Sequence, residues 1–181
     1  MKLQERGSDM VYVTVAGVIF LLDSVIKFLV EHLADGRKRV PVFGGKMYLT
    51  KYHNKGAFLN FGESRRVAVR YVSLALTAGC FVVFVVTLGR KGKGLLKLGL
   101  SMMLGGAFSN TYDRMARGYV VDYAGFSSKW KRFSDIAFNI SDFCIIIGAM
   151  LSALSRAEKK PETVKAATAA SGKTDRESPA S

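Results

Sequence analysis

Residues 138–154 read F-N-I-S-D-F-C-I-I-I-G-A-M-L-S-A-L, a long apolar run with an amide and a carboxylate near its start. A membrane-spanning helix needs about 20 mostly apolar residues, and this run approaches that length. An ionisable side chain inside such a helix costs roughly 2.5–3.5 kcal/mol on insertion scales, so it ordinarily marks a functional site. Asn139 and Asp142 are therefore candidates for a role in chemistry.

Three more apolar runs precede this one, so the sequence predicts a bundle of helices in a membrane. The run near the N-terminus has no small-residue cleavage site after it, and Asp23 and Lys27 interrupt it, so we interpret it as a retained helix and not as a signal peptide. The expected fold is an all-α membrane protein, a bundle of four transmembrane helices in a single domain over residues 1–155. Its four expected spans cover about residues 10–30, 67–88, 95–112 and 136–154.

The charge of the chain favours contact with lipid headgroups over contact with nucleic acid. The chain of 181 residues has a formal net charge of +13, but its Lys and Arg flank apolar runs and form no basic face of a soluble domain. We therefore expect membrane lipid as a partner and no nucleic acid.

Basic residues divide almost equally between the two sets of loops, so they do not decide the orientation. Residues 156–181 lack apolar periodicity and are expected to form a basic, polar, disordered tail.

The segment between the first two spans, residues 31–66, is expected to carry a small strand element on the membrane surface. Residues 40–50 (V-P-V-F-G-G-K-M-Y-L-T) place β-favouring residues around a Gly-Gly turn signal, and residues 52–61 are also candidates for extended structure.

Small residues in the third span predict that this helix lies at the centre of the bundle. In lipid, small side chains let helix backbones approach closely. The third span contains L-G-G-A-F-S-N, residues 104–110, and Gly148 with Ala149 in the fourth span are candidates for a matching surface.

Four ionisable residues are best explained by structural roles. Asp23 and Lys27 are four residues apart on one helical face, so they are expected to form an ion pair. Asp113 and Arg114 follow the third span and are expected to tie the end of that helix to a loop.

Asp122 and Asp142 form the strongest candidate for catalysis. An antiparallel bundle brings the end of the third span beside the start of the fourth, and Asp142 lies about six residues, or roughly 9 Å, into the expected fourth span. Two carboxylates at one shallow depth share a proton and titrate as a unit, which is the arrangement for aspartic peptide hydrolysis. Asn110 and Asn139 are expected to orient the carboxylates or to stabilise an oxyanion.

Other chemistries have less support in the sequence. His32 and His53 stand at no metal-ligand spacing, and no histidine lies near the third or fourth span for a serine triad. We expect no metal and no cofactor. Two alternatives stay open at this point: a small proton-coupled transporter that uses Asp142 and Asp23 as carriers, and a structural membrane subunit.

Five ordered motifs between residues 10 and 154 resemble those of bacterial lipoprotein signal peptidase, the signal peptidase II family. The family's D-x-x-x-K is similar to Asp23–Lys27, and its N-x-G-A-like motif is similar to Asn54–Phe58. The other three motifs are similar to Gly105–Arg114 (G-G-A-x-x-N-x-x-D-R), Val120–Tyr123 (V-V-D-Y) and Phe138–Asp142. Ser141 and Phe58 depart from the alanines that the family usually has, which bears on substrate fit.

The resemblance implies an aspartic endopeptidase that cleaves a diacylglyceryl-modified prolipoprotein just before its lipidated cysteine. It implies that Asp122 and Asp142 are catalytic. It also implies that the site is supported by Asn54, Gly56, Asn110, Asp113, Arg114 and Asn139. The implied location is the bacterial inner membrane, with both termini cytoplasmic, an extracytoplasmic β-cradle formed by the first outer loop, and the active site near the outer leaflet. We expect a monomer.

Overall fold

The computed structural model describes residues 2–35, 38–56, 63–127 and 136–157. The tail expected over residues 156–181 lies almost entirely outside the described residues. The extended segment expected over 52–61 is described up to residue 56, and its residues 52–54 belong to strand β2 (Met47–Asn54), as expected. The helices are α1 (Lys2–Leu33), α2 (Arg66–Leu88), α3 (Gly94–Ala116) and α5 (Ile140–Ala157), with short 3₁₀ turns at Phe43–Gly45 and Glu63–Arg65. The strands are β1 (Val40–Val42), β2 (Met47–Asn54), β3 (Val120–Phe126) and β4 (Ala137–Phe138).

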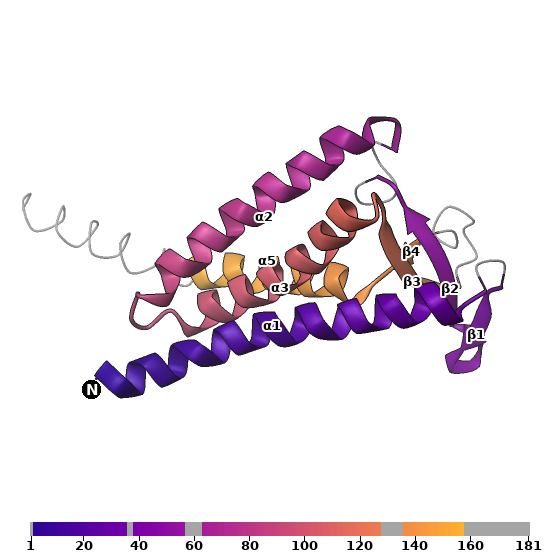
Figure 1. The fold of residues 1–181 in the computed structure, drawn as a ribbon. Coiled ribbons are helices and arrows are strands. Elements are labelled where there is room, and N and C mark those ends of the chain that lie inside the picture. The colour runs from indigo at the N-terminus through magenta and orange to yellow at the C-terminus, as the bar shows by residue number, and fades with distance from the viewer. Residues whose placement is uncertain (1, 36–37, 57–62, 128–135, 158–181) are drawn as a thin grey trace, which may run out of the picture.

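Helix α3 lies at the centre and contacts α1, α2 and α5 (Figure 1). Its glycines explain how close these contacts are. A Cβ atom added at Gly105 would lie 2.6 Å from the Ala16 carbonyl oxygen of α1, and one at Gly106 would lie 2.5 Å from the Ser141 carbonyl oxygen of α5. Gly148 of α5 packs in the same way against Gly99 of α3. The expected central position of the third span is confirmed, and its small residues are what permit it.

Substitution of Gly106 by valine is expected to destabilise the fold by about 1–3 kcal/mol, because the new side chain has to push α3 and α5 apart. Gly79→Ala on α2 is the control, since a Cβ at Gly79 meets nothing within 4 Å and alanine favours a helix. Thermal unfolding in detergent measures both. Equal midpoints for the two variants would show that the close approach of α3 and α5 carries no stability.

The four strands form one antiparallel sheet in the order β1-β2-β3-β4 at one end of the helices (Figure 1). Strand β2 pairs with β3 so that Asn54 lies opposite Val120 and Tyr52 opposite Asp122. The strand element expected after the first span is confirmed, but the expectation that the first outer loop alone builds it was incomplete. The segment between α3 and α5 supplies the two other strands, and this pairing places Asn54 beside Asp122.

Helix α5 begins later than the sequence suggested, and this changes the position of Asp142. The fourth span was expected to begin near residue 136, but residues 137–138 form β4 and the helix begins at Ile140. Asn139 is its N-cap: the Asp142 backbone N–H donates to Asn139 Oδ1 at 3.0 Å, and the Asn139 N–H donates to Asp142 Oδ2 at 3.1 Å. This reciprocal capping box places Asp142 in the first turn of α5, and not the 9 Å deep that we expected.

The distribution of side chains is that of a membrane protein, with polar groups inside and apolar groups outside. Asp23, Lys27 and Asn139 are each no more than 1% exposed, whereas Leu76 of α2 and Met150 of α5 are at least 60% exposed. Among the described residues, two helical segments are long and apolar enough to cross a membrane, Asp9–Leu33 and Arg66–Leu88. Helix α3 is not among these two segments. It contacts the three other helices, and its buried polar residues lower its mean hydropathy.

Candidate active site

A buried network of charges joins α1 to α3, and Lys27 is its centre. Lys27 Nζ lies 2.7 Å from Asp23 Oδ2 and 3.4 Å from Asp113 Oδ2, which confirms the expected ion pair and extends it. Lys27 also donates to Ser109 Oγ at 3.0 Å and to Asn110 Oδ1 at 2.7 Å. A buried ammonium group needs such partners because it has lost its water.

Asp23 is held by three hydroxyl groups from other elements. It accepts hydrogen bonds from Ser109 Oγ at 2.6 Å, Ser141 Oγ at 2.5 Å and Tyr123 Oη at 2.8 Å. Tyr123 Oη also accepts the Ile140 N–H at 3.0 Å, so it links α1 to the start of α5. Burial first, and then the nearby Asp23 charge, raise the pKa of Tyr123, so the phenol keeps its proton. The family that the sequence resembles usually has alanine at position 141. Ser141 adds a hydrogen bond to Asp23 that alanine cannot form.

The two candidate catalytic aspartates meet around Asn139. Asn139 Nδ2 donates to Asp122 Oδ1 at 2.7 Å, while the Asn139 backbone N–H donates to Asp142 as described above. Asn54 Nδ2 donates to Asp122 Oδ2 at 3.0 Å, and Asn110 Nδ2 donates to Asp142 Oδ1 at 2.9 Å. Each carboxylate is thus oriented by two amide groups from different elements.

Burial and charge make Asp122 a weak acid. Removal from water is the larger cause and the neighbouring Asp142 carboxylate is the second, and together they raise the pKa of Asp122 from 3.8 to about 7. The amides of Asn54 and Asn139 act in the opposite direction. Such a group can give or take a proton near neutral pH, which is the property needed for general acid–base catalysis.

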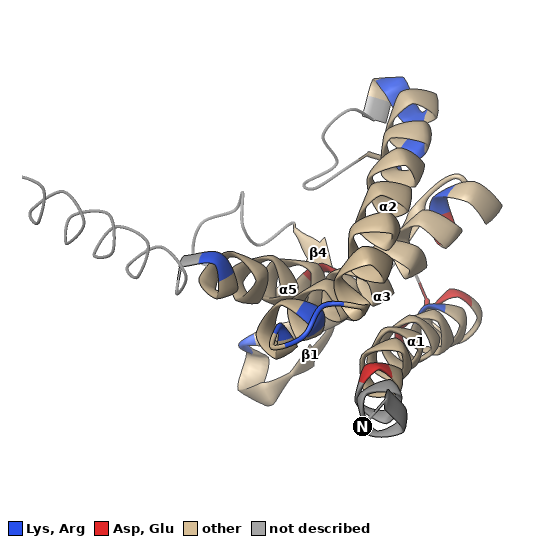
Figure 2. Ribbon diagram, turned by 90° about the vertical axis from the view of Figure 1, so that its left-hand side faces the viewer, with Lys and Arg blue, Asp and Glu red and all other residues tan. Residues whose placement is uncertain are grey.

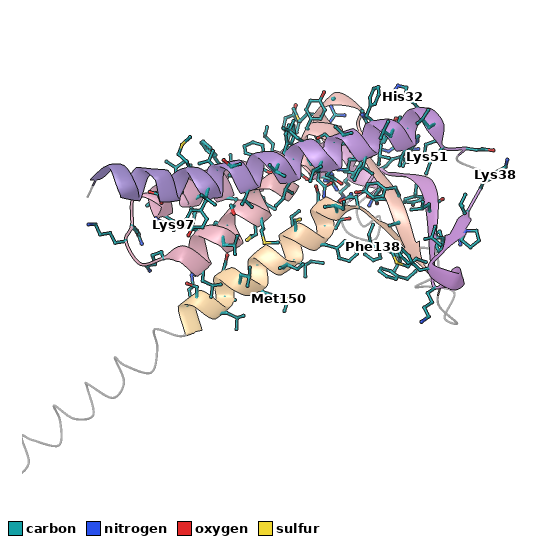
Figure 3. The ribbon with its side chains drawn as sticks, turned by 90° about the horizontal axis from the view of Figure 1, so that it is seen from below. His32, Lys38, Lys51, Lys97, Phe138 and Met150 are labelled. Carbon is teal, nitrogen blue, oxygen red and sulfur yellow. The ribbon has the colours of Figure 1, made fainter. Side chains whose placement is uncertain are left out.

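Both carboxylates line a cavity of about 420 Å³ between α2, α3 and α5. The other walls are mostly apolar and include Leu76, Ile145 and Phe138, whose position at the junction of the sheet and α5 is labelled in Figure 3. A peptide bond that enters this cavity would meet two acids in surroundings that contain little water. Mostly apolar walls with a few converging polar groups are typical of a ligand-binding site.

Arg114 and Asp113 attach the strands to the end of α3. Arg114 Nη2 donates to the Gly56 carbonyl oxygen at 2.9 Å, and its Nη1 donates to the Asn110 carbonyl oxygen at 3.3 Å. Asp113 Oδ2 accepts the Val121 N–H at 3.2 Å, next to Asp122. These contacts connect the end of α3 to Gly56, which follows β2, and to β3.

A family model described as signal peptidase (SPase) II matches residues 15–157 of this chain. The chain belongs to the signal peptidase II family. The lipoprotein signal peptidase of Ectopseudomonas mendocina (strain ymp) is 34% identical over 158 residues, which are 85% of this chain and 92% of the relative. The lipoprotein signal peptidase of Halothermothrix orenii is 30% identical over 78% of this chain and 91% of the relative.

The fold agrees with that of solved bacterial membrane enzymes. One such structure, determined by the in meso method at 2.3 Å resolution, superposes with a TM-score of 0.72 at 19% identity, covering 84% of this chain and 90% of the other. A second, at 1.9 Å resolution, gives a TM-score of 0.65. The resemblance to signal peptidase II is thus confirmed, and the transporter alternative has no support from these comparisons.

Sequence reasoning missed the hydroxyl groups that complete this signal peptidase II site. Tyr123 and Ser109 lie inside two of the motifs described above. The sequence, however, does not show which carboxylate a hydroxyl group will contact in the folded protein. It also missed the pair of His53 Nε2 with Glu31 Oε2 at 2.9 Å, which joins β2 to the end of α1. The N-x-x-D spacing at residues 139–142 could have revealed the helix start, because it is a capping-box pattern.

Proposed function

We propose that this signal peptidase II family member cleaves diacylglyceryl-modified prolipoproteins just before the lipidated cysteine, and that Asp122 and Asp142 are its catalytic residues. The observation that carries the assignment of these residues is that both carboxylates line one mostly apolar cavity and contact the same asparagine. Membership of the family identifies the chain as a membrane aspartic protease of prolipoproteins.

In the proposed mechanism the two acids hold one proton and activate one water molecule. The ionised carboxylate takes a proton from the water as its oxygen attacks the scissile carbonyl, and the protonated carboxyl donates to the carbonyl oxygen. In the resulting gem-diol, the newly protonated carboxyl gives its proton to the amide nitrogen, and the newly ionised carboxylate takes a proton from a gem-diol hydroxyl. The C–N bond breaks, and the pair returns to its starting state. Asn54, Asn110 and Asn139 keep the carboxylates oriented, and Arg114 with Gly56 holds the neighbouring loop in place.

The lipid on the substrate is proposed to deliver the peptide bond to this site. The diacylglyceryl chains would stay in the bilayer against the apolar cavity wall, so the bond before the cysteine is held at the depth of the first turn of α5. A substrate held in the membrane has to bring its scissile bond to the two aspartates over a short distance only, and this proximity raises the rate of cleavage.

We propose a monomer with four spans in the bacterial inner membrane and both termini in the cytoplasm. Three features support this topology: the start of α1, the turn between α2 and α3, and the end of α5 all lie at one end of the bundle, and the sheet lies at the other (Figures 1 and 3). In Figure 3, Lys97 marks the first end, and Lys51 and His32 mark the second. The sheet and both aspartates would then face the outer leaflet.

The proposed function is tested with purified protein and a synthetic prolipoprotein peptide in two forms, with and without diacylglycerol on the cysteine. We expect cleavage of the lipidated form only, with a product that begins at the modified cysteine, as identified by mass spectrometry. Cleavage at another bond, or equal rates for both peptides, would contradict the proposed substrate.

The pH dependence of kcat/KM is expected to show the loss of the shared proton near neutral pH. The raised pKa of Asp122, about 7, means that the carboxyl keeps its proton several pH units above its ordinary value of 3.8. Activity should therefore fall as the pH rises above about 7, and also fall in acid, where both carboxyls are protonated. A rate that still rises through this range would refute a dyad that shares one proton.

A further inference from the structure

The residues next to the two proposed catalytic aspartates meet at one buried carboxylate, that of Asp23. Tyr123 follows Asp122 in β3, and Ser141 precedes Asp142 in α5. Tyr123 Oη donates to Asp23 Oδ1 at 2.8 Å, and Ser141 Oγ donates to Asp23 Oδ2 at 2.5 Å. These three side chains are at most 6% exposed, and the described lining of the aspartate cavity includes none of them. The contact therefore lies outside the cavity.

The geometry of strands and helices explains how neighbouring residues serve these two places. Successive side chains of a strand point to opposite faces, so Asp122 lines the cavity while Tyr123 contacts α1. Adjacent side chains of a helix are about 100° apart, so Asp142 and Ser141 divide in the same way. Each aspartate is thus one residue away from a hydroxyl group that bonds to α1.

Tyr123 also contacts α5 directly. Its Oη accepts the N–H of Ile140, the first residue of α5, at 3.0 Å. The N–H groups in the first turn of a helix have no partner within the helix. One phenol oxygen therefore joins β3, α5 and α1, because it accepts from Ile140 while it donates to Asp23.

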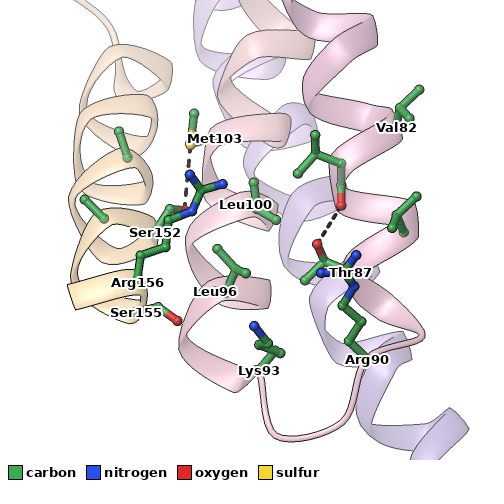
Figure 4. A pocket seen from close by; sticks show the side chains of 14 residues that line it. Val82, Thr87, Arg90, Lys93, Leu96, Leu100, Met103, Ser152, Ser155 and Arg156 are labelled. Carbon is green, nitrogen blue, oxygen red and sulfur yellow. Dashed lines mark hydrogen bonds between the residues drawn. The ribbon is translucent and has the colours of Figure 1, made fainter. Parts of the chain in front are cut away.

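The apolar contacts of α5 do not by themselves set its exact place. Its charged residues, Asp142 and Arg156, lie in its first and last turns, and its middle is uncharged (Figure 2). Toward its C-terminal end α5 borders a second, mostly apolar cavity of about 760 Å³ (Figure 4). Apolar attraction is non-directional, whereas hydrogen bonds require particular distances and angles. The bonds of Tyr123 and Ser141 therefore add to those of Asn139 in fixing the first turn.

We propose that Tyr123 and Ser141 are positioning residues, which through Asp23 set the separation of Asp122 and Asp142 that one bridging water molecule requires. This inference rests on the proposed peptidase function. Neither hydroxyl group touches the reacting atoms. A displacement of about 1 Å at a catalytic group can reduce a rate about 10²-fold, so a small shift of the first turn of α5 has a measurable effect.

Tyr123→Phe keeps the aromatic ring and removes both hydrogen bonds. We expect kcat on a lipidated prolipoprotein peptide to fall about tenfold, because the two carboxyls no longer hold their separation. KM should change by less than about twofold, since the cavity walls that bind the substrate are unaltered. Asp23 keeps its bonds to Lys27 and Ser109, so the fold should persist.

Ser141→Ala should reduce kcat less, by about threefold, because Tyr123 still ties α5 to Asp23. The double variant Y123F/S141A removes both connections to the same carboxylate. Its loss of kcat should therefore exceed the product of the two single losses, since each hydroxyl group partly compensates for the other.

The protonation of the aspartates provides a readout that a merely structural role would not change. The Asp142 charge is one cause of the raised pKa of Asp122, so a wider separation should lower this pKa. NMR titration of isotope-labelled aspartate carboxyl groups in detergent micelles, without substrate, measures it. Asp122 should titrate at least about 0.5 pH unit lower in Tyr123→Phe than in wild type, and the alkaline limb of the kcat profile should move the same way.

Two control variants remove a hydroxyl group elsewhere. Tyr71 of α2 is 61% exposed, and Ser152 Oγ lies 3.9 Å from Met103 Sδ at the second cavity (Figure 4). Tyr71→Phe and Ser152→Ala should leave kcat and the Asp122 titration as in wild type. Thermal unfolding in detergent shows that each variant is folded at the assay temperature.

Wild-type kcat and wild-type Asp122 titration in Tyr123→Phe and Y123F/S141A would overturn the positioning proposal, even if their unfolding midpoints fall. A wild-type protein that does not cleave the lipidated peptide would instead overturn the proposed function. The NMR titration needs no turnover, so it tests the positioning in either case.

Discussion

Asp122→Asn and Asp142→Asn are each expected to reduce kcat on a lipidated prolipoprotein peptide by at least about 10³-fold. An amide of nearly the same shape can neither take a proton from water nor give one to the carbonyl oxygen, and general acid–base catalysis contributes about 10²–10⁴-fold for each group. Because the two carboxyls act on one water molecule, the double variant should be little worse than either single one. Separation of product from substrate by chromatography measures the rates.

Asp35→Asn is the matched control, since Asp35 follows α1 at the same end of the molecule and its carboxylate is largely exposed, 3.9 Å from Lys38 Nζ. It should cleave at the wild-type rate. Retention of lipidated peptide by the two inactive variants, measured as a Kd, shows that the loss is in chemistry and not in binding. Substantial turnover by either Asp122→Asn or Asp142→Asn would exclude the proposed dyad.

Lys27→Met is expected to destabilise the protein by about 3–5 kcal/mol. The change leaves the Asp23 carboxylate, which is fully buried, and the Asp113 carboxylate beside it without their ammonium partner. Breaking one side of a buried ion pair costs this much because the remaining charge has lost both water and its partner. Chemical unfolding in detergent micelles, followed by circular dichroism, measures the change.

The double variant D23N/K27M should recover part of this stability, since it removes one of the two unpaired charges. Lys38→Met, at an exposed lysine, should change stability by no more than about 0.5 kcal/mol. If Lys27→Met unfolds at the wild-type denaturant concentration, the buried network is not what holds α1 to α3.

The motif residues that are close together in the sequence could be assigned from spacing, because helical geometry is local. The Asp23–Lys27 pair follows from a separation of four residues, and Asp113 with Arg114 follows from their place at a helix end. The position of Asp142 could not be derived in the same way. The run of apolar residues predicted that the fourth span begins at residue 136. In the structure, residues 137–138 pair with β3 as strand β4, and the helix begins at Ile140 after its N-cap, Asn139.

The sequence by itself determined the apolar helices, the strand signal around the Gly-Gly turn, the family, and the choice of Asp122 and Asp142 as candidates, because these depend on composition, on local periodicity and on ordered motifs. Only the tertiary structure decided which groups meet. The pairing of β2 with β3 sets Asn54 against Asp122, and the packing of α1, α3 and α5 joins Tyr123, Ser109 and Ser141 to Asp23. Such contacts join residues up to 118 positions apart, and no local preference of the chain encodes them.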